Sequence, residues 1–209
     1  MLMKVSAMNE LPKLLYRGDS DKMNKREIRA TLNYPILKTG LSDGGNGREI
    51  FLNPLQSLVH RHVAPGWDKT HFLSFTTDKG KALVYGGGEG EHYPISSDDK
   101  WDFVLFTLDT GKFIPDSIKQ LETGVYQVEY YPHSREFLPT YRILLIDVVT
   151  FLHKVKLSGS DDYSESIFKA ERDKEWLVYP ATPMRDSNEN TSKFDTGCII
   201  EKQAYKTYR

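Results

Sequence analysis

The 209-residue sequence has one cysteine, Cys198, so no disulfide can form within the chain. Scarce cysteine is typical of proteins in reducing compartments. No run approaches the ~18 apolar residues of a membrane-spanning helix. The N-terminal segment also lacks the apolar core of a cleavable secretion signal. We therefore expect a cytoplasmic protein, or one delivered into a target cell by separate machinery, with no membrane partner.

The sequence also has no large excess of charge of one sign, because its 28 lysine and arginine residues are nearly balanced by 29 acidic residues. The net charge therefore does not indicate binding to nucleic acid, although a positively charged patch can exist on a protein whose net charge is near zero. No internal repeat or linker divides the chain, and its length suits one domain with a substantial core. We expect a single domain over residues 1–209.

Strand patterns outnumber helical patterns along the chain. Strands are predicted at 11–20, 71–75, 101–114 (as strand, turn, strand), 140–157, 175–181 and 198–209. Helices are predicted over 22–34, 53–64 and 79–86, with Thr77 or Asp78 as the N-cap of the last. Loops are expected at 38–50, 85–99 and 157–166. This order indicates an α+β domain with mostly antiparallel strands and helices mainly in the N-terminal half.

Three short motifs carry side chains suited to one site. Arg17 ends the first strand; alone it suits a surface ion pair, but its planar fork of donors also matches phosphate oxygens. Ser74 and Thr76 share one face of their strand, where they either pair across strands or line a cleft. Glu175 begins "EWLVYP", and Asp173 shares its strand face if the strand starts there. A carboxylate entering an apolar strand must be solvated or paired, or it serves a developing positive charge.

In order, these motifs resemble the ADP-ribosyltransferase superfamily, in its Arg–Ser–Glu (cholera toxin-like) branch. The resemblance covers about residues 13–20, 71–86, 101–114 and 171–180. That branch commonly has Ser-Thr-Ser where this chain has Ser74-Phe75-Thr76. It commonly has Glu or Gln two residues before the catalytic Glu, where this chain has Asp173. Residues 115–157 have no counterpart that we can place.

The resemblance implies a split β-sandwich of two mostly antiparallel sheets, with NAD bound in the cleft as co-substrate and no metal. It implies a mono-ADP-ribosyltransferase with three catalytic residues. Arg17 clamps the diphosphate, Ser74 positions Glu175, and Glu175 stabilises the oxocarbenium ion formed when nicotinamide leaves. Residues expected to bind NAD are Tyr16, Arg17, Gly18, Ser74, Thr76 and Tyr85. Tyr85 follows Ala82 by one helical turn and is a candidate to stack on nicotinamide, with Tyr16 as a second candidate.

The resemblance assigns acceptor recognition to Asp173 and to the loop before it, in which Tyr163 is available to contact a target. The loop over 158–166 is acidic, which favours a protein acceptor with a cationic side chain over nucleic acid. Nucleic acid or nucleotide acceptors, NAD hydrolysis without an acceptor, and a non-catalytic protein-binding module on the same fold stay open. A toxin or effector of this kind acting inside its own cell, for example against phage, requires an antitoxin or other inhibitor.

His60 and His62 raise the question of a metal site. On a helix these positions diverge by about 200°, so the two rings cannot face one ion. We therefore expect no metal at this pair.

Overall fold

The computed structural model describes residues 11–20, 55–64, 72–96, 99–131, 141–179 and 199–208. The expected α+β class with antiparallel strands is confirmed, since every strand pairing in the described part is antiparallel. The helix expected over 22–34 and the loop expected over 38–50 lie outside these residues. No helix among the described residues is long and apolar enough to cross a membrane.

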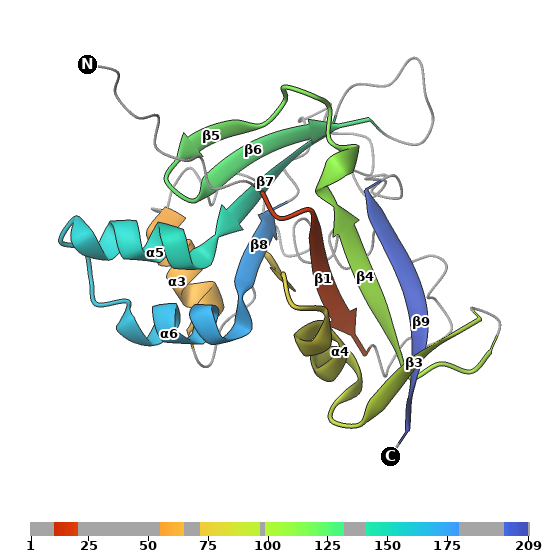
Figure 1. The fold of residues 1–209 in the computed structure, drawn as a ribbon. Coiled ribbons are helices and arrows are strands. Elements are labelled where there is room, and N and C mark those ends of the chain that lie inside the picture. Colours follow the sequence, from red (N-terminus) through yellow and green to blue (C-terminus); the bar gives the residue numbers. More distant parts are fainter. Residues whose placement is uncertain are drawn as a thin grey trace, which may run out of the picture.

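The described strands and helices are interspersed in sequence order (Figure 1). The strands are β1 (Leu14–Asp19), β2 (Leu73–Thr76), β3 (Glu91–Ile95), β4 (Phe103–Asp109), β5 (Lys119–Glu122), β6 (Val125–Tyr130), β7 (Tyr141–Asp147), β8 (Glu175–Tyr179) and β9 (Ile200–Tyr208). The helices are α3 (Leu55–Val63), α4 (Lys79–Gly87), α5 (Val148–Leu157) and α6 (Ser164–Asp173), with a short 3-10 turn, η1 (Thr110–Lys112).

All nine described strands belong to one sheet, in the order β3-β9-β4-β1-β2-β8-β7-β6-β5. The expectation of two sheets is therefore wrong for backbone pairing. The junction is narrow, because β1 and β2 share a single register pair, Tyr16 with Thr76. On either side the pairing is longer, with six pairs between β1 and β4 and four between β2 and β8. The sheet thus consists of two halves that meet at one point.

The two halves of the sheet close over a shared apolar core. Inward-facing side chains of β1, β4 and β9 pack with those of β2, β6, β7 and β8 in one buried cluster, which includes Leu15, Phe106, Val128, Leu145 and Val178. Figure 1 shows β6 and β7 running at a steep angle to β1, β4 and β9. Packing of this kind is possible because side chains alternate between the two faces of each strand.

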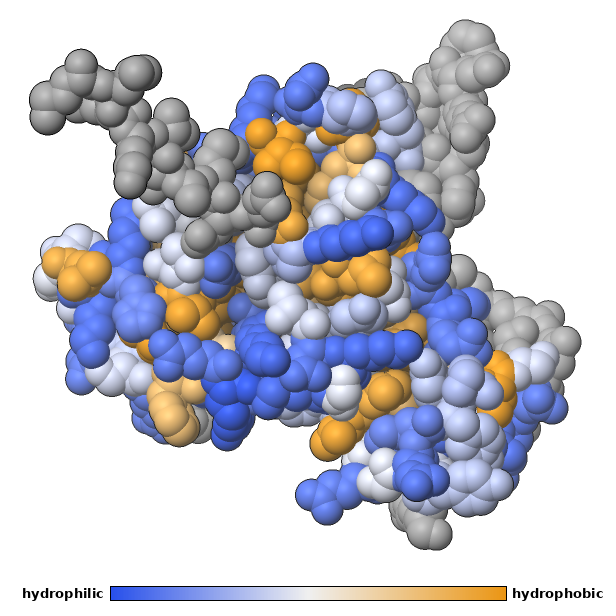
Figure 2. Space-filling view, viewed as in Figure 1, coloured by the Kyte–Doolittle hydropathy of each residue, from blue (hydrophilic) through white to orange (hydrophobic). Residues whose placement is uncertain are grey.

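Helices α3, α5 and α6 cover the other face of the β2–β8–β7 half (Figure 1). Their second apolar cluster joins helix residues such as Val59, Phe151 and Ile167 to strand residues such as Phe72 and Leu177. Exposed large apolar side chains in the described part are spread over several elements. Figure 2 likewise shows apolar residues interspersed with hydrophilic ones on this face. This surface therefore offers no single large apolar patch.

Helix α4 lies against β1 at backbone contact. Asp78 is its N-cap, with a side-chain oxygen that accepts a hydrogen bond from Lys81 N at 3.2 Å, which settles the choice between Thr77 and Asp78. A Cβ placed on Gly18 in β1 would lie 1.9 Å from Ala82 O. Only glycine allows the helix to approach so closely.

Several predicted elements differ from the observed ones in the second half of the chain. Residues 148–157 were expected as strand but form α5, because Asp147 caps the helix and the apolar residues recur at helical spacing. Those buried residues are Val148, Phe151, Leu152 and Val155. The predicted loop over 157–166 ends where α6 begins at Ser164. Two of the four described helices, α5 and α6, thus lie in the second half, where no helix was predicted.

Two further corrections concern the middle of the chain. Strand β3 lies within the loop predicted over 85–99; it pairs with β9, a distant partner that local sequence does not reveal. The segment 101–114 forms one strand, β4, followed by η1 rather than by a second strand. The predicted strands at 11–20, 71–75, 175–181 and 198–209 and the helices at 53–64 and 79–86 are confirmed within a few residues.

Candidate functional site

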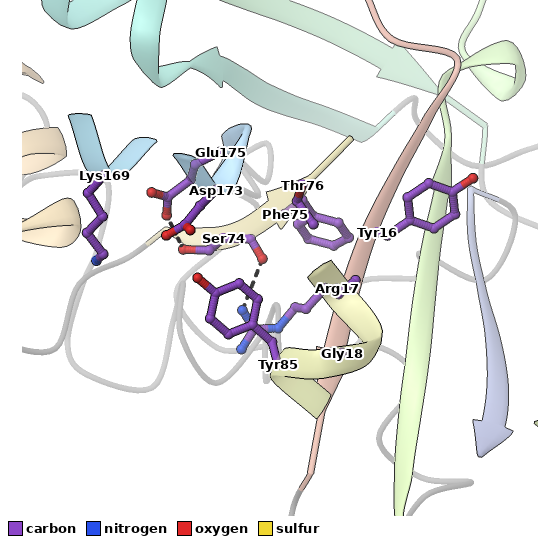
Figure 3. A pocket seen from close by; sticks show the side chains of 11 residues that line it. Tyr16, Arg17, Gly18, Ser74, Phe75, Thr76, Tyr85, Lys169, Asp173 and Glu175 are labelled. Carbon is purple, nitrogen blue, oxygen red and sulfur yellow. Dashed lines mark hydrogen bonds between the residues drawn. The ribbon is translucent and has the colours of Figure 1, made fainter. Parts of the chain in front are cut away.

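A pocket of about 300 Å³ opens where β1, β2, α4 and the α6–β8 junction meet, beside the junction of the two sheet halves (Figure 3). This volume lies at the lower end of the range for small-molecule sites. The pocket is lined by Tyr16, Arg17, Gly18, Ser74, Phe75, Thr76, Ala82, Tyr85, Lys169, Asp173 and Glu175. All three predicted catalytic residues, Arg17, Ser74 and Glu175, are therefore in one hollow.

The register between β2 and β8 explains the hydroxyls on an otherwise buried strand. Ser74 pairs with Leu177, and Thr76 pairs with Glu175, so these four side chains share one face. At one end of that face apolar residues pack under the helices. At the other end Ser74, Thr76 and Glu175 line the pocket. The polar residues thus mark the point where the buried face becomes the wall of a cavity.

Ser74 holds the carboxylate of Glu175. Ser74 Oγ donates to Glu175 Oε1 at 2.6 Å, and Glu175 is only 7% exposed. Burial raises the pKa of Glu175, while the hydrogen bond from Ser74 and the charge of Lys169 act in the opposite direction. Oε2 is buried and has no hydrogen-bond partner among the described residues. A fixed carboxylate with one unpaired oxygen therefore faces a cavity, and this oxygen is suited to accept a hydrogen bond from a ligand hydroxyl.

His62 on α3 completes the chain of hydrogen bonds behind Ser74. His62 Nε2 lies 2.8 Å from Ser74 Oγ. Because the Ser74 proton points to the carboxylate, Oγ accepts this bond, and His62 carries its proton on Nε2. Burial, followed by the charges of Arg17 and Lys169, lowers the pKa of His62 to about 3. The ring is therefore neutral at physiological pH and orients Ser74 without adding charge.

Sequence reasoning did not assign His62 to the site, although a signal was present. His62 follows Leu58 by four residues and Val59 by three, so it shares the buried face of α3. His60 points elsewhere, with Nδ1 2.8 Å from Ser166 Oγ. The predicted divergence of the two rings is thus observed. The described residues contain no cluster of three or more metal-ligating side chains.

Arg17 reaches across the junction between the sheet halves. Its Nη1 donates to the backbone oxygen of Ser74 at 3.1 Å, and its Nη2 lies 3.5 Å from Asp19 Oδ2. Figure 3 shows the guanidinium pointing toward the Ser74 strand. Arg17 Nε is buried and has no hydrogen-bond partner within the described part of the chain. The guanidinium is therefore held in place while it keeps donor capacity for an anion.

Lys169 on α6 is a second cation of the pocket. The sequence alone did not indicate it, because α6 was not predicted. Its Nζ donates to Val63 O at 2.7 Å, which fixes the ammonium group at the wall. Lys169 and Arg17 both favour the ionised form of Glu175. The pocket thus combines two cationic donors with a buried carboxylate acceptor, and this combination fits a ligand with both anionic and hydroxyl groups.

The residues expected to contact NAD all line the pocket, in different ways. Thr76 Oγ1 already accepts from Asp78 N at 3.0 Å, so its hydroxyl is committed to the start of α4. Gly18 provides the close contact with α4. Tyr85 is 60% exposed at the pocket mouth. In Figure 3 the ring of Tyr16 lies apart from the Ser74–Glu175 pair. Tyr85 is therefore the better placed of the two aromatics for a ring bound near Glu175.

The predicted acceptor residues require two corrections. Tyr163 is only 2% exposed and its ring packs 4.9 Å from that of His60, so the expectation that it is available to a target is wrong. Its side chain belongs instead to the buried apolar cluster that includes Ile167 and Ala170 of α6. Asp173 ends α6 and does not share a strand with Glu175, because Lys174 turns the chain with φ 50°. Asp173 nevertheless lines the pocket.

Comparisons of this chain with family models, with curated proteins and with solved structures found no match. Inferences about its function therefore depend on the chemistry of the pocket and on the motifs that form it.

Proposed function

We propose that this protein is an NAD-dependent mono-ADP-ribosyltransferase that moves ADP-ribose from NAD to a macromolecular acceptor. The observation that carries the proposal is the meeting of Arg17, Ser74 and Glu175, from β1, β2 and β8, in one pocket. These elements are far apart in sequence, and the hydrogen bond between Ser74 and Glu175 spans 101 residues. Their combination is the one expected from the resemblance to the Arg–Ser–Glu branch.

Each side chain has a task in breaking the bond between nicotinamide and ribose. The electron pair of that bond leaves with nicotinamide, and positive charge develops on the ribose, as in glycoside hydrolysis. Glu175 supplies a fixed negative charge for that carbon and an unused oxygen for a ribose hydroxyl. Ser74 and His62 hold the carboxylate in position. Arg17 offers a planar donor set to the diphosphate.

Glu175 must be ionised to stabilise the developing cation. Burial raises its pKa, and the Ser74 hydrogen bond and the Lys169 and Arg17 charges oppose this effect. These three contacts therefore favour the charged carboxylate in a place where burial favours the neutral acid. The acceptor then attacks the ribose carbon with a lone pair and releases a proton.

The test is to incubate the purified chain with NAD labelled in its adenylate half, with and without cell lysate. We expect nicotinamide release and label bound to macromolecules, and a decrease of both by about 10²–10³-fold in Glu175→Gln. Label in protein, label in nucleic acid and free ADP-ribose alone distinguish protein transfer, nucleic-acid transfer and simple hydrolysis. No nicotinamide release under any condition contradicts an enzyme and favours a non-catalytic binding module.

A further inference from the structure

A guanidinium of this chain already pairs with Asp173, a carboxylate that lines the pocket. Arg172 Nε donates to Asp173 Oδ1 at 2.8 Å, and Nη2 donates to Oδ2 at 3.0 Å. The Asp173 side chain is 10% exposed, whereas that of Arg172 is 56% exposed. Asp173 therefore forms part of the inner wall, and Arg172 covers it from the solvent side. The contact is bidentate, which is the strongest form of this ion pair.

Asp173 is the second carboxylate beside the reacting centre. Burial raises the pKa of Glu175 most, and the negative charge of Asp173 raises it further. A cationic acceptor entering the pocket would find its natural counter-ion in Asp173. Both oxygens of Asp173 already accept hydrogen bonds from Arg172, and the nearby Tyr85 hydroxyl helps to lower the pKa of Asp173. Lys81 adds a nearby positive charge. An incoming cation therefore finds Asp173 already paired with Arg172, and it is repelled by the positive charges of Arg172 and Lys81.

A purely structural role for the pair makes a different prediction. Asp173 is the last residue of α6, where a carboxylate is disfavoured by the helix dipole, and Arg172 offsets that cost. If this were its whole role, removing Arg172 would lower stability and leave the choice of acceptor unchanged.

We propose that Arg172 acts as an internal guanidinium that occupies Asp173 and so excludes guanidinium acceptors from the pocket. Arg172 is then a specificity-determining residue, and the wild-type protein uses an acceptor other than an arginine side chain. This inference rests on the proposed transferase activity. It replaces the sequence-based expectation that the acidic loop over 158–166 favours an acceptor with a cationic side chain.

The test uses agmatine as a guanidinium acceptor for the full chain and NAD. In transfer, the bond from ribose to nicotinamide breaks, a bond from ribose to a guanidinium nitrogen forms, and one proton is released. The measured quantity is the ratio of ADP-ribosyl-agmatine to free ADP-ribose. We expect a low ratio for the wild type and a rise of about tenfold for Arg172→Gln, because one charge-assisted interaction is freed.

Arg142→Gln is the matched control. Arg142 also pairs through Nε with a carboxylate, that of Glu129, at 2.6 Å, and its side chain is 55% exposed. It lies on β7 and does not line the pocket. We expect this variant to keep the wild-type ratio. The double variant Arg172→Gln/Asp173→Asn should lose the gain, because the freed carboxylate is then absent.

The possible results separate the two proposals. An Arg172→Gln ratio equal to that of the wild type overturns the inference about Arg172 if nicotinamide is still released. Efficient agmatine transfer by the wild type overturns it as well. No nicotinamide release from any of the proteins contradicts the transferase itself, and the inference then fails with it. Release by Arg172→Gln also shows that this variant is folded.

Discussion

Replacing Ser74 by alanine removes one hydroxyl that connects two buried groups. Ser74 Oγ donates to Glu175 Oε1 at 2.6 Å and accepts from His62 Nε2 at 2.8 Å. The contact of Arg17 is made to the backbone oxygen of residue 74, so it survives the change. Ser74→Ala therefore isolates the contribution of the hydroxyl to the state of the carboxylate.

The size of the effect follows from the kind of bond that is lost. A hydrogen bond to a charged group contributes about 1.5–3 kcal/mol, which corresponds to about a 10- to 100-fold change in rate. Burial raises the pKa of Glu175, and the Ser74 bond opposes that shift. Without the hydroxyl, the acid limb of the pH–rate profile should move to higher pH. We expect nicotinamide release at pH 7 to fall by about 10- to 100-fold.

The assay is the rate of nicotinamide release from NAD between about pH 5 and 9. Ser74→Thr keeps a hydroxyl and should stay near the wild-type profile. Ser117→Ala is the matched control, since Ser117 is 8% exposed and its hydroxyl bonds to both backbone groups of Glu129 at 3.2 Å. It should lower stability without moving the acid limb. A Ser74→Ala profile that coincides with that of Ser117→Ala would refute the positioning role of Ser74.

Three further changes test other parts of the site. Glu175→Gln should lower nicotinamide release by about 10²–10³-fold. Because burial raises the pKa of Glu175, its ionisation opposes folding above pH 4.5. The same variant should therefore raise Tm at pH 7, by about 2–4 °C for each kcal/mol gained, and an unchanged or lower Tm contradicts this. Arg17→Lys keeps the charge but loses the planar fork, so KM for NAD should rise about tenfold with a smaller change in kcat; a loss confined to kcat counts against a binding role. His62 has its pKa lowered to about 3 from 6.5, so the unfolded chain takes up the proton first and stability is lost as pH falls through that window. His62→Gln should flatten this dependence by up to about 1.4 kcal/mol per pH unit in urea titrations, and an equally steep slope in the variant rules the linkage out.

The parts of the site that were predictable are those encoded locally. The alternation of β2 placed Ser74 and Thr76 on one face, and the cap at Asp78 set the start of α4. Glu175 was predicted as a site residue because a carboxylate that enters an apolar strand costs free energy unless it is solvated, paired or functional. Each of these signals depends on a few neighbouring residues, so one sequence is enough to read it.

The rest depends on contacts between distant segments. Residues 140–157 form a continuous apolar stretch, and a strand and a buried helix share that composition; the helix cap at Asp147 decides where one gives way to the other. His62 becomes part of the site only through α3 packing beside β2. The Arg172–Asp173 pair depends on α6 ending at the pocket, and α6 was not predicted. None of these follows from spacing alone.

The backbone contact between β1 and α4 has a consequence for how the pocket can vary. Tyr85, on one side of the mouth, is carried by a helix whose Ala82 carbonyl rests against Gly18. Any side chain introduced at position 18 must displace the whole helix, and Tyr85 with it. The distance between β1 and α4 at the mouth is thus fixed by main-chain atoms, which a side-chain substitution cannot shorten. Changes of ligand size in related sequences should therefore come from the side chains that project inward, while this crossing stays the same.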